Sequence, residues 1–468
     1  MQAAGEIMQA LAAAGHAVYI VGGAVRDILR GVEPADIDLA TNAVPAEIVA
    51  VAMSQGWQTV TVGAAFGVVV VVIGERNYEV ATFRCERYGT DSHRPESVAF
   101  GVGLAEDLAR RDFTINAMAM SADGRVVDLF GGRQDLAGRL IRTVGNPHDR
   151  FAEDGLRMFR AARFAARLGF AIETATMAAI STNLGRVNGL SVERVRCEIE
   201  KTLLAEFPAQ GFEVLQTTGL LGTTCQAKEQ GKIYSVPVLP ELEHLRGLPQ
   251  NRQYHLYDAW RHTLETVALT PPELHLRWSA LLHDIAKGWP GVRTLNRAGQ
   301  PSDPGHDQAG ALAALTILSR LRVERRIMDR VVWLVRQHLV LPVAERKAVL
   351  KWLKRLAGDF KSNSQFTVAL AQLFSLHQAD RLAGHTQPDI NGLENIRKLA
   401  GRLVQEVPFF PVQLRLSGQE IAAAIGGGPG VGCFQRNLLE RIQAGQLSNT
   451  RNELVAALDA RARRIRNP

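Results

Sequence analysis

The sequence predicts an α+β chain in which a small mixed β-sheet comes first and helices make up most of the remainder. Short β-rich runs alternate with helical patterns from residue 1 to about residue 130, and Val68–Ile73 and Tyr78–Phe83 are the clearest strands. From Asp135 onward the apolar residues recur mainly at helical spacing, most strongly between Asp149 and Leu168. Since 468 residues exceed the usual size of one domain, this change of pattern predicts several domains.

Breaks in the pattern suggest where the domains meet. Proline and glycine gather between residues 223 and 252, and Pro408–Pro411 forms a second break. We therefore expect a mixed-sheet head at 1–134, a helical neck at 135–222, a linker at 223–252, a histidine-rich helical domain at 253–400 and a tail at 401–468.

Composition limits the classes of function. The formal net charge is +7, which suits a polyanionic partner. The four cysteines are scattered without a Cys-x-x-Cys pair, which argues against a structural zinc site and fits a reducing cytoplasm. Apolar runs such as Val68–Ile73 are too short to span a bilayer, and the chain opens without a leader-like segment. We expect a cytoplasmic protein with no membrane association and no obligate protein partner.

The stretch Val21–Asp27 has the pattern of a phosphate-binding turn. Gly22 and Gly23 lie between an apolar strand and a short helix, so a phosphate can approach the backbone closely. Arg26, one turn into that helix, can add a charge-assisted contact.

Two carboxylates follow at the spacing of a metal site. Asp36 and Asp38 stand two apart on an expected strand from Asp36 to Thr41, so both side chains point to one face. Glu79 is a polar residue within an apolar strand and is a candidate third carboxylate, although a solvated strand residue would have the same pattern. Carboxylates beside a phosphate cradle suit a pair of Mg²⁺ ions.

Arginines continue the pattern downstream. Arg111 and Asp112, at an expected helix start, can bind a triphosphate and ribose hydroxyls. The expected helix Asp149–Leu168 presents four further polar residues on about one half of its surface. A carboxylate accepts and a guanidinium donates, so the first two of them can imitate a pairing base while the others face phosphates. These four residues are Asp154, Arg157, Arg160 and Arg163.

Histidines mark the second half of the chain. An adjacent His-Asp pair stands at the end of an apolar helix, with a further histidine upstream and a further aspartate downstream. These imidazole and carboxylate side chains together suit a divalent metal ion that activates water. The four residues are His262, His283, Asp284 and Asp380, and His306 and His338 can serve a second metal.

These motifs resemble those of the class II tRNA nucleotidyltransferase and bacterial poly(A) polymerase superfamily. The likeness begins at Gly22–Thr41 and continues through Glu106–Ala117, Glu153–Arg163 and Ser191–Glu198, and the segment 416–451 resembles the family's RNA-holding tail. The histidine-rich region resembles the HD phosphohydrolase superfamily, with the four ligands named above. The resemblance implies a nucleotidyltransferase head, Mg²⁺, and addition of nucleotides from CTP and ATP to tRNA 3′ ends. It also implies a phosphohydrolase that uses Ni²⁺, Mn²⁺ or Co²⁺.

Several activities remain open at this point. The charged segment Arg84–Pro95, with Asp91 and Arg94, is expected to be a surface loop and resembles the flexible loop that accompanies A addition, so both full CCA addition and A-only addition fit. Poly(A) polymerization is disfavoured because Trp57–Gly74 contains no Lys or Arg. An HD hydrolase whose head only binds nucleotide or RNA, and a catalytically inactive RNA-binding protein, are the alternatives from other classes.

Overall fold

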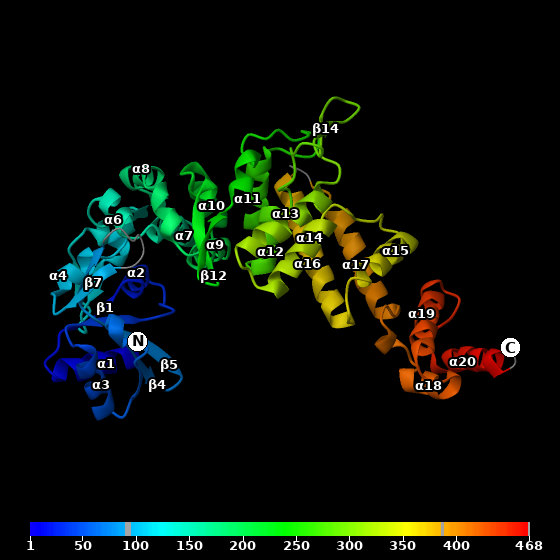
Figure 1. Cartoon of the computed structure of the whole chain (residues 1–468), viewed down its shortest axis with the longest axis horizontal. Helices are drawn as coiled ribbons and strands as arrows, with labels where there is room; N and C mark the ends of the chain where they lie inside the picture. Colours follow the sequence, from blue (N-terminus) through cyan, green and yellow to red (C-terminus); the bar gives the residue numbers. More distant parts are fainter. Residues whose placement is uncertain (89–94, 385–387, 467–468) are drawn as a thin grey trace. The chain divides into compact units, whose positions relative to one another are not determined.

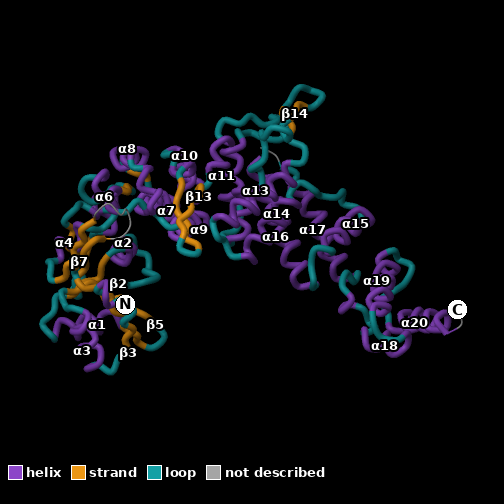
Figure 2. The backbone as a smooth tube through the Cα atoms, viewed as in Figure 1, coloured by secondary structure: helices purple, strands orange, loops and turns teal. Residues whose placement is uncertain are grey.

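The computed structural model describes residues 1–88, 95–384 and 388–466 (Figure 1). Its contacts divide the chain into two compact units. The first comprises residues 1–244 and 317–323, and the second comprises residues 245–316 and 324–468. Strands concentrate in the first unit and helices dominate the second, as Figure 2 shows, which confirms the α+β prediction.

A seven-stranded sheet organises the head, in the order β3-β4-β5-β2-β1-β8-β9. β2 and β5 run parallel while the other neighbours are antiparallel, so the sheet is mixed as predicted. The strands are β1 (Val18–Val21), β2 (Asp38–Thr41), β3 (Gln58–Val60), β4 (Val68–Ile73), β5 (Arg76–Thr82), β8 (Met118–Met120) and β9 (Val126–Asp128).

Helices cover this sheet and bury its apolar side chains. The head helices are α1 (Gln2–Ala13), α2 (Gly23–Leu29), α3 (Pro45–Ser54), α4 (Leu104–Ala109) and α5 (Gly132–Ala137). Ile7 and Leu11 of α1 and Ile48 of α3 join Val69 and Val80 of the sheet in one core, each at most 2 % exposed. Burial of each such side chain contributes about 1.5–3 kcal/mol to the stability of the fold. This packing holds in place the edge of the sheet where β1 ends and β2 begins.

Part of the segment expected to be a surface loop is a β-strand. β6 (Arg84–Tyr88) pairs antiparallel with β7 (Pro95–Phe100). The prediction of a loop from residue 84 was therefore wrong, because the charges within β6 conceal its strand pattern. Asp91 and Arg94 lie outside the described residues.

The neck is helical, with one break that the sequence did not indicate. Its helices are α6 (Pro147–Glu153), α7 (Leu156–Leu168), α8 (Thr174–Thr182), α9 (Val192–Leu203) and α10 (Pro208–Thr217). The single helix expected from Asp149 to Leu168 is in fact two helices, because Asp154 has an extended backbone with φ −144° and ψ 107°. A second hairpin, β12 (Thr224–Glu229) and β13 (Lys232–Pro237), occupies part of the expected linker.

The second unit is built from helices, as expected. They are α11 (Ala259–Leu269), α12 (Leu274–Leu282), α13 (His306–Arg320), α14 (Arg325–Gln337), α15 (Arg346–Ala357), α16 (Asn363–Gly384) and α17 (Ile390–Glu406). The tail follows as α18 (Gly418–Ile425), α19 (Pro429–Gln443) and α20 (Arg451–Arg466), with its own small core around Ile421 and Leu438. Across the part of the chain that the structure describes, the helices all lack the combination of length and apolar composition that crossing a membrane requires.

Candidate functional sites

A cavity of about 570 Å³ opens beside the glycine turn of the head. Its wall holds Gly22, Gly23 and Asp38 together with an unusual number of guanidinium groups. These belong to Arg26, Arg84, Arg110, Arg111, Arg157, Arg160, Arg163, Arg167 and Arg194. Arginine binds phosphate through charge-assisted hydrogen bonds, so the cavity suits a strongly anionic ligand of nucleotide size.

Three carboxylates gather at the edge of the sheet next to this cavity. Asp38 is the first residue of β2, and the parallel register of Leu39 with Val80 brings Glu79 beside it. Asp36 lies just before β2 rather than on it, so the expected strand from Asp36 was too long by two residues.

Charge repulsion is evident within this carboxylate cluster. Desolvation raises the pKa of Asp38, the neighbouring carboxylates of Glu79 and Asp36 raise it further, and Arg111 opposes them. Crowded carboxylate oxygens that resist ionising together are the donor set that hard divalent cations bind. The residues present therefore fit Mg²⁺.

Gly22 is required by two features of its position. Its φ is +71°, where only glycine is unstrained, and a Cβ there would lie 3.0 Å from Nη1 of Arg111. Arg111 is in turn held by Asp107, with 3.2 Å between Nη2 and Oδ2. The glycine turn thus allows this guanidinium to lie directly over the backbone.

Arg26, which was expected to contact a phosphate, is held by protein partners in the structure. Its side chain is 1 % exposed, its Nε donates to Asp27 at 2.9 Å, and its Nη1 donates to Oδ1 of Asn116 at 2.6 Å. Its guanidinium also lies 5.5 Å from the ring centroid of Phe164 on α7. These partners favour a role in joining α2 to its neighbours over contact with a phosphate.

Asp112 continues the same network. Arg160 donates from Nε to Oδ2 of Asp112 at 2.8 Å, and Asn116 donates to Oδ1 at 3.2 Å. Asp112 is buried, and although burial opposes its ionisation, Arg160 and Asn116 lower its pKa to about 2. The residue thus links the head to α7, while its oxygens have little capacity left for a ribose.

The residues expected to read a base are also engaged with protein partners. Asp154 accepts from the backbone N–H of Leu156 and from Arg194, each at 3.0 Å. Arg157 is paired with Glu153 and donates to the carbonyl of Arg110 at 2.9 Å.

Arg163 is likewise paired, its Nε lying 2.6 Å from a carboxylate oxygen of Glu198 on α9. Asp154 and the three arginines nevertheless all line the cavity.

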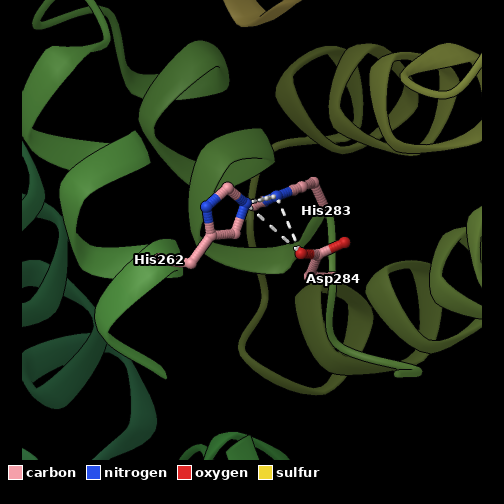
Figure 3. A group of neighbouring side chains, drawn as sticks. All are labelled: His262, His283 and Asp284. Atoms are coloured by element: carbon pink, nitrogen blue, oxygen red, sulfur yellow. Dashed lines mark hydrogen bonds and ion pairs between the residues drawn. The ribbon is translucent and has the colours of Figure 1, made fainter. Parts of the chain in front are cut away.

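The histidine cluster lies in the second unit. Figure 3 shows His262, His283 and Asp284 pointing toward one another. His262 Nε2 lies 3.3 Å from His283 Nε2, and His283 Nε2 lies 3.2 Å from Oδ2 of Asp284. Asp380 approaches from α16, with 3.0 Å between its Oδ1 and His262 Nε2. All four predicted ligands therefore converge.

A second group shares Asp284 with the first. His306 Nε2 is 3.1 Å and His338 Nε2 is 3.8 Å from the other carboxylate oxygen, Oδ1. Two overlapping sets of buried donors thus surround one aspartate, namely His262, His283 and Asp284, and Asp284, His306 and His338.

Backbone carbonyls fix the direction of the rings. The Nδ1 atoms of His283, His306 and His338 approach the carbonyls of Ala280, Asp303 and Val335 at 2.8, 2.6 and 2.7 Å. A ring that donates from Nδ1 presents a bare Nε2 to a metal, and this arrangement is typical of metal-ligating histidine.

The charges of the cluster also favour a cation. Burial lowers the pKa of His283, but the Asp284 and Asp380 carboxylates outweigh it and raise that pKa to about 10. The donor set of imidazoles and carboxylates fits a divalent transition metal.

Some residues at these sites were not predicted from the sequence. Lys287 lies 2.6 Å from Oδ2 of Asp284 and 2.8 Å from Gln250, in the wall of a 290 Å³ cavity beside the metal ligands. The three-residue spacing from Asp284, one helical turn, was the available signal. Arg194 lies in the segment Ser191–Glu198, which resembles a family motif, but it was not singled out as a site residue. Arg167 gave no signal of its own, since only the folded chain brings it to the head cavity.

Family comparisons agree with these sites in position and order. The family described as "Poly A polymerase head domain" matches residues 18–142. "Probable RNA and SrmB-binding site of polymerase A" matches residues 169–223, and "HD domain" matches residues 259–374.

A solved structure extends the likeness to the whole chain. The crystal structure of the Bacillus stearothermophilus CCA-adding enzyme in complex with CTP matches with a TM-score of 0.69 at 28 % identity, covering 100 % of this chain and 99 % of that chain. In its head, neck and HD regions the chain is similar to the tRNA nucleotidyltransferase and poly(A) polymerase superfamily. The resemblance drawn from the sequence motifs is thereby confirmed.

Curated CCA-adding enzymes match about half of the chain. The CCA-adding enzyme of Limosilactobacillus reuteri (strain DSM 20016) is 46 % identical over 214 residues, which cover 46 % of this chain and 52 % of the relative. The CCA-adding enzyme of Pediococcus pentosaceus is 40 % identical over 268 residues, covering 57 % of this chain and 65 % of the relative. The chain thus spans about half the length of the first curated relatives it matches. Nucleotidyltransferase heads and HD domains typically depend on metal ions, and the histidine cluster here brings together groups that could hold one.

Proposed function

We propose that the protein adds nucleotides from CTP and ATP to the 3′ ends of tRNA without a template, completing the CCA terminus. The observation that supports this most strongly is the cavity in which Asp38 of the carboxylate cluster, the glycine turn and nine arginines meet. The names of the similar proteins, CCA-adding enzymes, point to the same activity.

The carboxylates are proposed to hold two Mg²⁺ ions. Asp36, Asp38 and Glu79 have the oxygen donors and the position for this role. Bound there, Mg²⁺ would supply Lewis acidity toward the triphosphate and the attacking 3′-hydroxyl. The protein's own contribution is to hold the carboxylates close together and in place at the edge of the sheet.

The arginines are proposed to bind the triphosphate. Arg111 lies over the Gly22 backbone, where a phosphate can receive both a guanidinium and the close approach that glycine permits. Arg160 and Arg163 are held by carboxylates on other elements, so their positive groups are fixed before a ligand arrives. Such preorganisation favours binding because little ordering remains to be done.

Asp154 and Arg157 are proposed to read the base. Cytosine and adenine each present an amino group, which can donate a hydrogen bond to a carboxylate. Uracil and guanine carry a carbonyl oxygen at the corresponding position, which cannot donate one. One pair of side chains can therefore accept both nucleotides while excluding uracil and guanine.

A direct assay distinguishes the activities within the family. Labelled tRNAs that end before, within and at the last position of CCA are incubated with CTP, ATP or both, and product lengths are read at single-nucleotide resolution. We expect the full CCA terminus from each substrate. Extension only of tRNAs that already end in CC would identify an A-adding enzyme, and long A tracts would identify a poly(A) polymerase.

A second function is proposed for the histidine cluster, namely metal-dependent hydrolysis of phosphate esters. It is supported by the convergence of His262, His283, Asp284 and Asp380 and by the adjoining cavity that contains Lys287. We propose Ni²⁺, Mn²⁺ or Co²⁺ as the metal, and 2′,3′-cyclic phosphates or terminal monophosphates of RNA as substrates. Phosphate release from cyclic nucleotides, measured with each metal, tests this assignment.

The regions of the chain are proposed to divide these tasks. The head at 1–134 performs transfer, the neck at 135–222 selects the nucleotide, and residues 223–252 connect it to the HD domain at 253–400. The tail at 401–468 is proposed to hold RNA, and its last helix is rich in arginine. The four cysteines are free, in keeping with a cytoplasmic location.

A further inference from the structure

The carboxylate of Asp154 is held on both of its oxygens by the protein. Oδ1 accepts the backbone N–H of Leu156, at the start of α7, at 3.0 Å. Oδ2 accepts from Nη2 of Arg194, also at 3.0 Å. Because Asp154 lies in the extended break between α6 and α7, no helical backbone fixes its side chain, and these two contacts define its plane.

Arg194 is well placed to act as a fixed support. It lies in the first turn of α9, and its backbone N–H is accepted by the N-cap side chain of Ser191. Val192 and Val195, on either side of it, are fully buried. α9 packs against α7, so Arg194 is carried by a helix that packs on the one bearing Arg157, Arg160 and Arg163 of the cavity wall.

The alternative partners of Asp154 explain why a support is needed. Arg157, Arg160 and Arg163 line the same cavity, and each carries a positive charge that can compete with Arg194 for the carboxylate of Asp154. Each is already paired with another carboxylate: Arg157 with Glu153, Arg160 with Asp112 and Arg163 with Glu198. With Arg194 in place, Asp154 keeps one orientation and its remaining lone pairs are available in the cavity.

We propose that Arg194 is a specificity-determining positioning residue, which holds the carboxylate of Asp154 in place as an acceptor for the amino group of cytosine or adenine. A carboxylate has about four acceptor positions, and Leu156 and Arg194 occupy two of them. The others can accept N4–H of cytosine or N6–H of adenine, whereas O4 of uracil and O6 of guanine would face a like partial charge. This inference rests on the proposed nucleotide transfer in the head.

The test compares Arg194→Ala with wild type and with Lys201→Ala, a control at an exposed position of the same helix. The rate of addition to tRNA is measured separately for ATP, CTP, GTP and UTP. We expect the preference for ATP and CTP over GTP and UTP to fall roughly tenfold in Arg194→Ala, since a site whose polar groups are no longer held loses its discrimination. Lys201→Ala should keep the wild-type preference, and Arg194→Lys should restore part of it.

The outcomes separate this inference from the function on which it rests. Equal loss of rate for all four nucleotides, with the preference unchanged, would overturn the role of Arg194. Absence of any addition by wild type would instead overturn the proposed transfer activity. If Arg194→Ala does not fold, Arg194→Gln, which retains a neutral donor of similar length, is measured in its place, and an unchanged preference in that variant also overturns the inference.

Discussion

Replacing Asp112 by asparagine should destabilise the first unit by a predictable amount. The carboxylate is buried and accepts from Arg160, from Asn116 and from the backbone N–H of Phe113. Asparagine retains the shape and one acceptor but removes the charge that Arg160 neutralises. The link between the head and α7 should weaken accordingly.

The size of this destabilisation can be worked out from the hydrogen bond and from the pKa of Asp112. A charge-assisted hydrogen bond contributes about 1.5–3 kcal/mol. The pKa of Asp112 falls from an ordinary 3.8 to about 2, and a shift of this size corresponds to roughly 2 kcal/mol. For a unit of this size a loss of 2 kcal/mol should lower Tm by about 4–8 °C.

The pH dependence has a defined sign. Because the folded-state pKa of Asp112 is depressed, its contribution is complete above the unfolded-state value near 4 and is lost as pH falls toward 2. The stability difference between wild type and Asp112→Asn should therefore be full at pH 6 and shrink between about pH 4 and pH 2.

Calorimetry of the full chain measures this, with hydrogen exchange used to assign the transition to residues 1–244. Asp123→Asn is the control, since Asp123 is exposed in a turn and should leave Tm nearly unchanged. An unchanged Tm in Asp112→Asn, or a difference that persists undiminished at pH 2, would refute the assigned network.

Three further predictions concern the two sites. Gly22→Ala should lower the rate of nucleotide addition by roughly tenfold or more because the new Cβ meets Arg111. Gly74→Ala, also at positive φ but with open space around its Cβ, should leave the rate per folded molecule unchanged. Steady-state rates of the two variants test this, and equal rates would contradict the prediction. Shortening the segment 84–95 should remove A addition and spare C addition, as read from product lengths, and equal loss of both would assign the segment to general catalysis or folding. His283→Ala should abolish metal-dependent phosphate release while leaving nucleotide addition largely intact, and release that persists would locate hydrolysis elsewhere.

The fold class and several residues of both sites were indicated by local patterns. The glycine turn, the Asp-x-Asp spacing and the His-Asp pair depend on residues close together in the sequence, and their structural context follows from strand and helix periodicity. Asp38, Glu79 and the four expected histidine-cluster ligands accordingly lie where those patterns indicate.

The pairing of charges was not predictable from the same patterns. Periodicity showed that Arg160 and Asp154 are polar positions near α7, but not that Asp112 and Arg194 would meet them from other elements. Such contacts join residues about 40 or more positions apart and depend on how the helices pack. The break at Asp154 was missed for a related reason, since its carboxylate caps Leu156 and stabilises an extended backbone that the apolar periodicity does not register.

We propose that nucleotides are transferred to tRNA at the carboxylate edge of the head sheet. The most direct test is extension of a tRNA transcript lacking CCA, with CTP, ATP and Mg²⁺, by wild type and by Asp38→Ala. We predict that wild type stops after adding C, C and A. Asp38→Ala, with an unchanged unfolding profile, should be slower by about a thousandfold or more, because it loses several kcal/mol of transition-state stabilisation. Near-normal extension by Asp38→Ala, or no extension by wild type, would contradict the account.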